Sequence, residues 1–186
     1  MAYYFFPQVI PKSECKRLLN YCLNCSDFIS GTIGSEAKQT KKRNNHVSFV
    51  EDEDNTMRDM LWGFIRHANE QFFNYDLNFF QTLQFSRYRR GEYYGWHQDS
   101  LGSWNSINNT SNENLNGKTR KISMSLILSD PDEYEGGQLE IWGKPIDVYK
   151  KGSIIFFPSW MPHRVTPVTK GTRYSLVMWF MGAPFK

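Results

Sequence analysis

The chain has 186 residues, of which 40% are hydrophobic and 16% aromatic. A chain of this length and composition can bury a sizeable core as one domain, which excludes disorder along its whole length. The formal net charge of +3 is too small to indicate nucleic-acid binding by itself, and no apolar run approaches the length of a membrane-spanning helix.

The N-terminal part is predicted to contain a strand followed by a helix. Residues 3–6 form an aromatic run typical of a short strand, and a helix is expected over residues 11–22, with Ser13 as a candidate cap. Cys15 and Cys22 are seven positions apart, which places both on one face of this helix as core residues. Cys22 and Cys25 form a C-x-x-C pair without a second pair, so core packing is favoured over a zinc or redox site.

The cysteine count also bears on location. Three cysteines, an odd number, without a visible signal peptide favour reduced thiols and a cytoplasmic protein.

Residues 31–45 are polar and contain glycine, and are expected to form a loop.

A second helix and a series of short strands follow in the chain. Residues 46–50 alternate like a strand, and residues 55–74 carry apolar side chains at three- and four-residue spacing, which predicts a helix. Short alternating or aromatic runs then dominate, over residues 82–88, 122–128, 138–142, 153–157, 164–168 and 173–180. Two helices followed by many short strands predict an α+β, mainly β fold, with the helices packed on one face of a closed or double-layer β core.

Residues 100–118 form a polar stretch rich in Asn and Ser. We expect a loop there, and two interpretations stay open: a lid over a site, or a surface insertion.

Three polar residues have the spacing of a metal site. In His97-Gln98-Asp99, residues i and i+2 of an extended strand project to the same face. His163 comes from a later strand and would complete a set of two imidazoles and one carboxylate. This set is the facial triad of non-haem Fe(II) oxygenases. The same three ligands could also hold zinc, but the chain lacks an H-E-x-x-H hydrolase motif.

The last predicted strand presents a charge on one face. Arg173, Ser175, Val177 and Trp179 share one parity, whereas the alternate residues 174, 176, 178 and 180 are apolar or aromatic and are expected to pack against the helices. A buried Arg173 needs an anionic partner. That partner would be an Asp or Glu in a structural salt bridge, or a bound carboxylate that the guanidinium grips through two hydrogen bonds.

Taken together, these motifs match a known family. Residues 88–99 (YRRGEYYGWHQD), 136–139 (GGQL) and 156–180 (FFPSWMPHRVTPVTKGTRYSLVMWF) resemble the 2-oxoglutarate/Fe(II) dioxygenases of the prolyl 4-hydroxylase type. The resemblance implies a double-stranded β-helix (jelly roll). It also implies a single domain over residues 1–186, with a strand-helix support over about 1–78 and a catalytic core over about 79–182.

The resemblance assigns roles to individual residues. It implies that His97, Asp99 and His163 bind Fe(II) and that Arg173 pairs with the distal carboxylate of 2-oxoglutarate. Tyr88 would hydrogen-bond this cosubstrate, and Ser175 and Trp179 would line the same pocket. Ser123, Ser125 and Ile127 share a parity that could face it too. The cofactors implied are Fe(II), 2-oxoglutarate and O2, with ascorbate as a further candidate.

The substrate is less defined. The resemblance implies hydroxylation of an unactivated C–H bond, and a prolyl residue in a peptide or protein is the leading expectation. Hydroxylation of a free amino acid or other small molecule is the first alternative. The nucleic-acid demethylases of this superfamily carry a second arginine six residues after the cosubstrate arginine, where this chain has Trp179, so nucleic acid is disfavoured. A non-catalytic jelly-roll binding domain is the last alternative. No membrane partner is expected, and the oligomeric state is not predicted.

Overall fold

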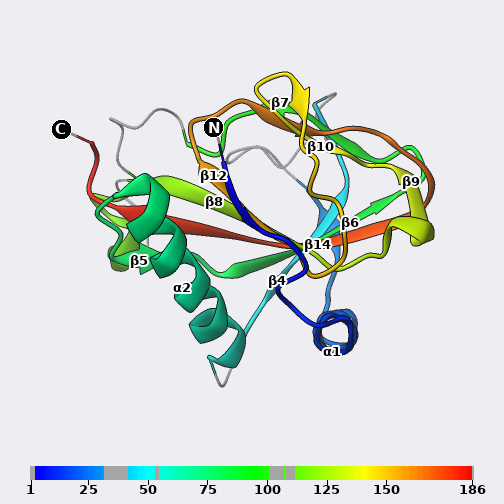
Figure 1. The fold of residues 1–186 in the computed structure, drawn as a ribbon, viewed down its shortest axis with the longest axis horizontal. Coiled ribbons are helices and arrows are strands. Elements are labelled where there is room, and N and C mark those ends of the chain that lie inside the picture. The colour runs from blue at the N-terminus through cyan, green and yellow to red at the C-terminus, as the bar shows by residue number, and fades with distance from the viewer. Residues whose placement is uncertain (1–2, 32–41, 53–54, 101–106, 108–111, 186) are drawn as a thin grey trace.

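The computed structural model describes residues 3–31, 42–52, 55–100, 107 and 112–185. Two antiparallel sheets face each other, and two helices lie on the far side of the larger one (Figure 1). The segments predicted as polar loops, 31–45 and 100–118, lie partly outside the described residues, and the expectation of a lid falls on that part. Where they are described they are not loop throughout: residues 43–44 form strand β3, which pairs with β7 (Tyr93–His97), and residues 113–115 form a 3-10 turn. No helix within the described part of the chain has the length and apolar character needed to cross a membrane.

The larger sheet has the strand order β1-β12-β8-β14-β6-β4-β2, and both β5 and β9 pair with β14. β14 lies at its centre, between β8 and β6. The strands are β1 (Tyr4–Phe6), β2 (Ile29–Ser30), β4 (His46–Val50), β5 (Phe79–Phe80), β6 (Leu83–Arg89), β8 (Thr119–Ile127), β9 (Tyr134–Gly136), β12 (Ile154–Pro158) and β14 (Val168–Gly182).

The smaller sheet has the strand order β11-β10-β13-β7-β3. Its strands are β3 (Arg43–Asn44), β7 (Tyr93–His97), β10 (Leu139–Ile141), β11 (Lys144–Pro145) and β13 (His163–Val165). Ile141 of this sheet packs with Ile127, Ile155 and Phe157 of the larger sheet, so an apolar layer lies between the two. This arrangement confirms the predicted mainly β jelly roll.

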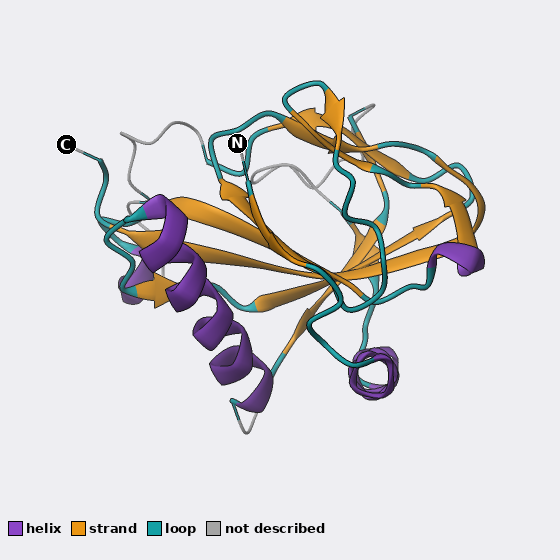
Figure 2. Ribbon diagram, viewed as in Figure 1, coloured by secondary structure: helices purple, strands orange, loops and turns teal. Residues whose placement is uncertain are grey.

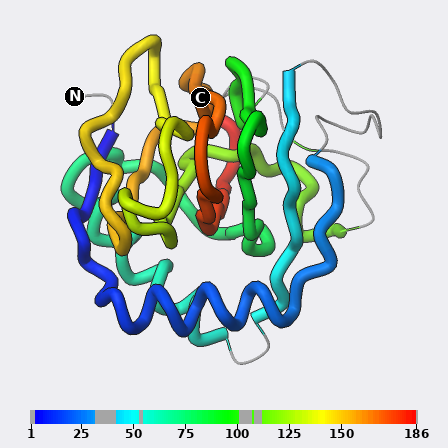
Figure 3. Tube along the Cα trace, turned by 90° about the vertical axis from the view of Figure 1, so that its right-hand side faces the viewer, coloured from blue at the N-terminus to red at the C-terminus, as the bar shows by residue number. Residues whose placement is uncertain are grey.

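The helices are α1 (Lys12–Asn24) and α2 (Thr56–Ala68), and α2 continues into a π-helical turn, η1 (Asn69–Phe73). Two short 3-10 turns, η2 (Glu113–Leu115) and η3 (Pro131–Glu133), complete the helical elements of the described residues. Figure 2 shows α1 and α2 on the same side of the larger sheet, and Figure 3 shows α1 running beneath the strands.

The main core lies between the helices and the larger sheet. Leu18 of α1 and Leu61 of α2 pack in one cluster with Leu176, Met178 and Phe180 of β14. Burying a side chain of this size contributes about 1.5–3 kcal/mol to stability. The predicted apolar parity of the last strand is therefore confirmed, and this face of β14 fixes which way Arg173 and Ser175 point.

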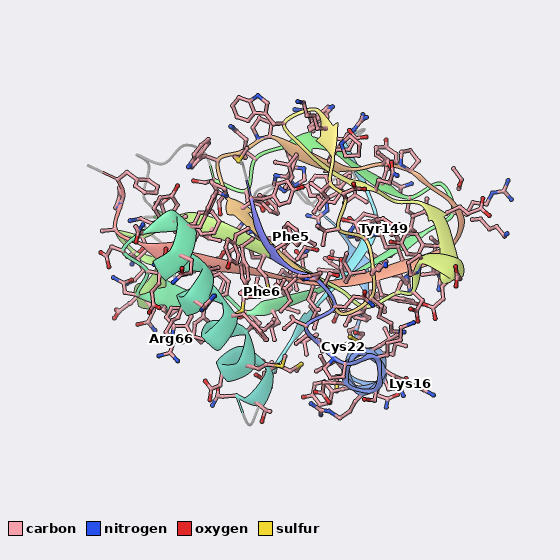
Figure 4. All side chains as sticks on the ribbon, viewed as in Figure 1. Phe5, Phe6, Lys16, Cys22, Arg66 and Tyr149 are labelled. Carbon is pink, nitrogen blue, oxygen red and sulfur yellow. The ribbon has the colours of Figure 1, made fainter. Side chains whose placement is uncertain are left out.

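Neighbouring residues of the N-terminal strand and helix face opposite sides of these elements. On β1, Phe5 packs in the layer between the sheets, whereas Phe6 packs in the helix-facing core (Figure 4). On α1, Cys22 is fully buried and Lys16 is exposed. Cys15 is buried as well, as the seven-residue spacing predicted.

Some predicted boundaries were wrong. Ser13 does not cap α1: the helix begins at Lys12, Pro11 occupies the cap position, and no side chain caps it. The second helix was expected to reach residue 74, but α2 ends at Ala68 and the π-helical turn follows, stopped by Asn74 in the left-handed conformation (φ 53°). β14 begins at Val168, earlier than expected, because its first residues pair with β9.

Candidate metal centre

Three predicted ligands meet between the two sheets. His97 ends β7, Asp99 follows two residues later, and His163 begins β13, where it lies opposite His97 in the register of the small sheet. The Nε2 atom of His97 is 3.6 Å from Asp99 Oδ1, and the Nε2 atom of His163 is 3.4 Å from Asp99 Oδ2. One ligand atom from each residue lies within 4.8 Å of the others. Within the described residues, no other His, Cys, Asp and Glu side chains form such a group.

Backbone carbonyls orient both imidazoles. His97 Nδ1 lies 2.8 Å from the Gly95 carbonyl oxygen, and His163 Nδ1 lies 2.9 Å from that of Met161. Because Nδ1 is then the donor, Nε2 of each ring faces the site and can give its lone pair to a metal ion. Burial of His163 lowers its pKa, but the charge of Asp99 and a hydrogen bond to it raise the pKa above the ordinary value in the metal-free protein. Burial lowers the pKa of His97 to about 3, with a further contribution from His163, which keeps His97 in the neutral, ligating form.

The Asp99 carboxylate is held ionised by its neighbours. Burial opposes its charge, but the charge of His163 and its hydrogen bond to the carboxylate outweigh that effect and keep the pKa of Asp99 far below its ordinary value. Ser123 Oγ donates to Asp99 Oδ2 at 2.7 Å and lies 2.9 Å from Ser159 Oγ. Two imidazoles and one ionised carboxylate on one side of a cavity are the donor set that Fe(II) takes in the facial triad, so these residues fit the metal that the sequence predicted.

Arg173 lies in the same cavity without a carboxylate partner. Its side chain is 3% exposed, its Nη1 donates to Ser175 Oγ at 3.1 Å, and its Cζ lies 5.5 Å from the centre of the Tyr88 ring. No Asp or Glu of the described chain forms an ion pair with it, so the structural salt bridge is not supported. A buried guanidinium costs free energy unless an anion pairs with it, and a ligand carboxylate would supply that anion.

Glycine makes room for this arginine. Gly137 has φ +61°, and a Cβ built there would lie 3.0 Å from Arg173 Cδ and 2.9 Å from Val168 Cγ2. The G-G-x-L motif thus lets the turn after β9 pass close to the arginine stem.

One cavity is lined by all seven residues that the sequence selected for the site, namely His97, Asp99, His163, Tyr88, Arg173, Ser175 and Trp179. Tyr88 is buried there, and burial raises its pKa. The Trp179 indole Nε1 is also buried and has no hydrogen-bond partner in the described part of the chain. An unpaired buried donor beside a buried cation marks a cavity suited to a ligand with acceptor oxygens.

The predicted parity of β8 is confirmed, since Ile122, Met124 and Leu126 pack in the helix-facing core, but the three residues of the other parity do not all line this cavity. Ser125 lines the cavity and Ser123 lies behind Asp99, but Ile127 lines a neighbouring cavity that also reaches Arg173. Sequence reasoning also left Tyr94 without a role, although its ring lies 3.4 Å from that of His97, nearly parallel at 10°.

Replacing Ser123 by alanine should weaken metal binding about 10- to 100-fold, because a hydrogen bond that orients a ligand carboxylate is lost. Anaerobic Fe(II) titration measures this. Ser153→Ala is the matched control, since Ser153 is equally buried but accepts its hydrogen bond from the Gln8 N–H. Wild-type affinity in Ser123→Ala would show that Asp99 needs no such support.

Comparisons with known proteins agree with this site. Residues 83–181 match the family model of the 2OG-Fe(II) oxygenase superfamily. A PKHD-type hydroxylase of Aliarcobacter butzleri is 34% identical over 93% of this chain and 75% of its own length. One from Shewanella sp. (strain MR-7) is 40% identical over 55% of this chain. The matches to the relatives from Shewanella sp. strains MR-7, ANA-3 and MR-4 span 43% of the length of each, which is less than half.

Solved structures show the same fold. A viral collagen prolyl hydroxylase from Paramecium bursaria Chlorella virus-1, in complex with 2-oxoglutarate, superposes with a TM-score of 0.73 and 20% identity, covering 98% of this chain and 97% of its own. A Trichoplax adhaerens prolyl hydroxylase, in complex with a hypoxia inducible factor peptide fragment, has a TM-score of 0.76 and 18% identity, covering 96% and 83%.

Proposed function

The chain belongs to the 2-oxoglutarate/Fe(II) oxygenase superfamily. We propose that it hydroxylates an unactivated C–H bond and that its substrate is a prolyl residue in a peptide or protein. The observation that carries the proposal is the meeting of the His97, Asp99 and His163 ligands with the unpaired Arg173 guanidinium in one buried cavity. A metal site alone would suit several chemistries, whereas a metal site beside a buried cation suits an oxygenase that uses a dicarboxylate cosubstrate.

The cofactors of the family are Fe(II), 2-oxoglutarate and O2. His97, Asp99 and His163 would hold the metal, and Arg173 would bind the distal carboxylate of 2-oxoglutarate. When bound, the metal supplies the activation of O2, coupled to oxidation of 2-oxoglutarate to succinate and CO2. Tyr88 and Ser175 would fix the cosubstrate by hydrogen bonds.

The remaining walls of the cavity shield the reaction. Leu139, Phe157, Val165 and Val177 line it between the polar groups. These apolar side chains exclude water, which strengthens the electrostatic interactions of Arg173 and Asp99 and protects reactive species from side reactions.

Two observations support a peptidyl prolyl substrate, and the names of the relatives support hydroxylation alone. Prolyl hydroxylases are among the solved structures that share this fold, and one of them was solved with a peptide fragment bound. Trp179 stands where the demethylases carry a second arginine. The relatives at 33–41% identity are PKHD-type hydroxylases, a name that gives hydroxylation without a prolyl target. A free amino acid or other small molecule is the second candidate.

A succinate-release screen tests the proposal. Proline-rich peptides, free amino acids and methylated oligonucleotides are each supplied with Fe(II), 2-oxoglutarate and O2, and mass spectrometry locates the added oxygen. We expect proline-rich peptides to stimulate succinate release and to gain oxygen on proline. Stimulation by free amino acids alone would replace the peptide substrate, and stimulation by methylated oligonucleotides alone would contradict the assignment.

A spectroscopic test addresses the non-catalytic alternative. Anaerobic addition of Fe(II) and 2-oxoglutarate should give the weak visible charge-transfer band that is typical of this family. A protein without this band, and without metal affinity, would be a jelly-roll binding domain.

A further inference from the structure

Three planar groups stack in a column that ends at the metal ligand His97. The Tyr94 ring lies parallel to the His97 ring, with centroids 3.4 Å apart and planes inclined by 10°. Over the Tyr94 ring lies the guanidinium of Arg43, with Cζ 4.4 Å from the ring centre. A permanent cation, a phenol and a metal-binding imidazole are thus in line.

The strand pairing builds this column. β3 pairs with β7 so that Arg43 lies directly opposite Tyr94, and the Gly95 N–H donates to the Lys42 carbonyl oxygen at 2.6 Å. On its other edge β7 pairs with β13 through an irregular register, in which Val165 is opposite Tyr94 and His163 is opposite His97. Val165 is two residues after His163 on β13, whereas Tyr94 is three residues before His97 on β7, so β7 contains a β-bulge. In a regular strand Tyr94 and His97 would point to opposite faces, and the bulge brings the Tyr94 ring to the face of the His97 ring.

Arg43 is held firmly in place. It is 7% exposed, and its Nε donates to Asn45 Oδ1 at 2.7 Å. Gly31 leaves room above it, since a Cβ at that position would lie 2.4 Å from both Arg43 Nε and Asn45 Oδ1. Burial of a guanidinium is costly, and here its planar face is used against Tyr94.

The column constrains the imidazole ligand. Tyr94 covers one face of the His97 ring, while the Nδ1 contact with the Gly95 carbonyl oxygen fixes its edge. With both the plane and the edge fixed, Nε2 can point only toward Asp99 and His163. Groups behind a histidine ligand that fix its orientation commonly determine metal affinity.

We propose that Arg43 is a positioning residue for the metal ligand His97, acting through Tyr94, and that its cation tunes the donor strength of this ligand. The inference rests on the proposed Fe(II) site. Without the guanidinium, Tyr94 can move off the imidazole, and His97 can rotate out of the triad. Without the charge, His97 donates more strongly to the metal, which shifts the charge-transfer band. The loss of its fixed orientation is the larger effect on the Kd for Fe(II).

Arg43→Gln removes both the charge and the planar cation. Arg87→Gln is the matched control, because the Arg87 guanidinium also lies over an aromatic ring, 4.1 Å from the centre of Phe28, but this ring packs against Phe85 in the helix-facing core and not against a metal ligand. Purified apo protein is titrated anaerobically with Fe(II), with and without 2-oxoglutarate, and its unfolding temperature is recorded.

We expect Arg43→Gln to raise the Kd for Fe(II) about 10- to 100-fold and to shift the charge-transfer band of the Fe(II) and 2-oxoglutarate complex. Arg87→Gln should change neither, even where it lowers the unfolding temperature. Tyr94→Phe should stay within about twofold of wild type, whereas Tyr94→Leu should reproduce the loss. The double variant Arg43→Gln/Tyr94→Leu should lose no more than Tyr94→Leu alone, because both act through one contact.

Gly31→Ala tests the positioning role of Arg43 separately from its charge, because the added methyl group displaces the Arg43 side chain while the guanidinium stays charged. It should also weaken Fe(II) binding. Three results would each overturn the inference while the proposed function stands. They are wild-type Fe(II) affinity with an unshifted band in Arg43→Gln, a loss of Fe(II) affinity in Arg87→Gln equal to that in Arg43→Gln, and additive losses in the double variant. Absence of Fe(II) binding by the wild-type protein would instead refute the proposed function.

Discussion

Asp99→Ala should reduce succinate formation to background. Asp99 is the one anionic ligand in the triad, it lies between the two imidazoles, and Ser123 donates to its Oδ2. Loss of an outer hydrogen bond typically costs 10- to 100-fold in metal affinity, so loss of the ligand itself should cost more than about 100-fold. Fe(II) titration and succinate release with excess 2-oxoglutarate measure the two consequences.

Loss of a buried carboxylate could also act through folding, and Asp52→Asn controls for this. The Asp52 side chain is even more buried than that of Asp99, at 3% against 9% exposed. It accepts the Arg58 N–H at 2.8 Å at the start of α2, outside the cavity. Asp52→Asn should lower the unfolding temperature and keep Fe(II) binding. Succinate release at the wild-type rate by Asp99→Ala would show that the triad is not the metal site.

The sequence predicted those site residues whose positions follow from simple strand alternation. His97 and Asp99 are two residues apart, and Arg173, Ser175 and Trp179 share the parity opposite to Leu176 and Phe180, so one amphipathic strand pattern orders them. Only the resemblance to a known family predicted that β7, β13 and β14 lie around one site. Pairing between strands that are far apart in the sequence does not appear in the local hydrophobic periodicity.

Two β-bulges account for the residues that were missed. The irregular pairing of β7 with β13 turns Tyr94 toward His97. In the pairing of β14 with β8, Phe180 is opposite Ile122, but the next residue, Met181, is opposite Arg120, so one residue of β8 is left without a partner on β14. This bulge turns the Arg120 side chain to the face of Trp179, with Cζ 3.9 Å from the centre of its ring. After a bulge, each side chain of the strand points to the face opposite to the one that alternation predicts, and a single sequence does not show where a bulge occurs.

Arg173→Gln should raise the Kd for 2-oxoglutarate by about 30-fold to several thousand-fold, which corresponds to roughly 2–5 kcal/mol for truncating one partner of a buried charged pair. The glutamine can still hydrogen-bond Ser175, but it cannot grip a carboxylate through two charged N–H groups. Calorimetric titration of the metal-loaded protein with 2-oxoglutarate, without O2, measures the Kd. Arg173→Lys keeps the charge but loses the planar guanidinium, so its Kd for 2-oxoglutarate should lie between that of the wild-type protein and that of Arg173→Gln.

The stability of the apo protein separates a ligand-binding arginine from a structural one. A structural salt bridge would be broken by Arg173→Gln, and the unfolding temperature would fall. The described residues give Arg173 no carboxylate, so its buried charge is unpaired until a ligand binds. Removing that charge should leave the apo unfolding temperature unchanged or higher. The rise that 2-oxoglutarate produces in the wild-type protein should disappear, since this rise depends on binding to the folded state. A less stable apo variant that still binds 2-oxoglutarate normally would assign Arg173 to the fold and leave the cosubstrate without its anchor.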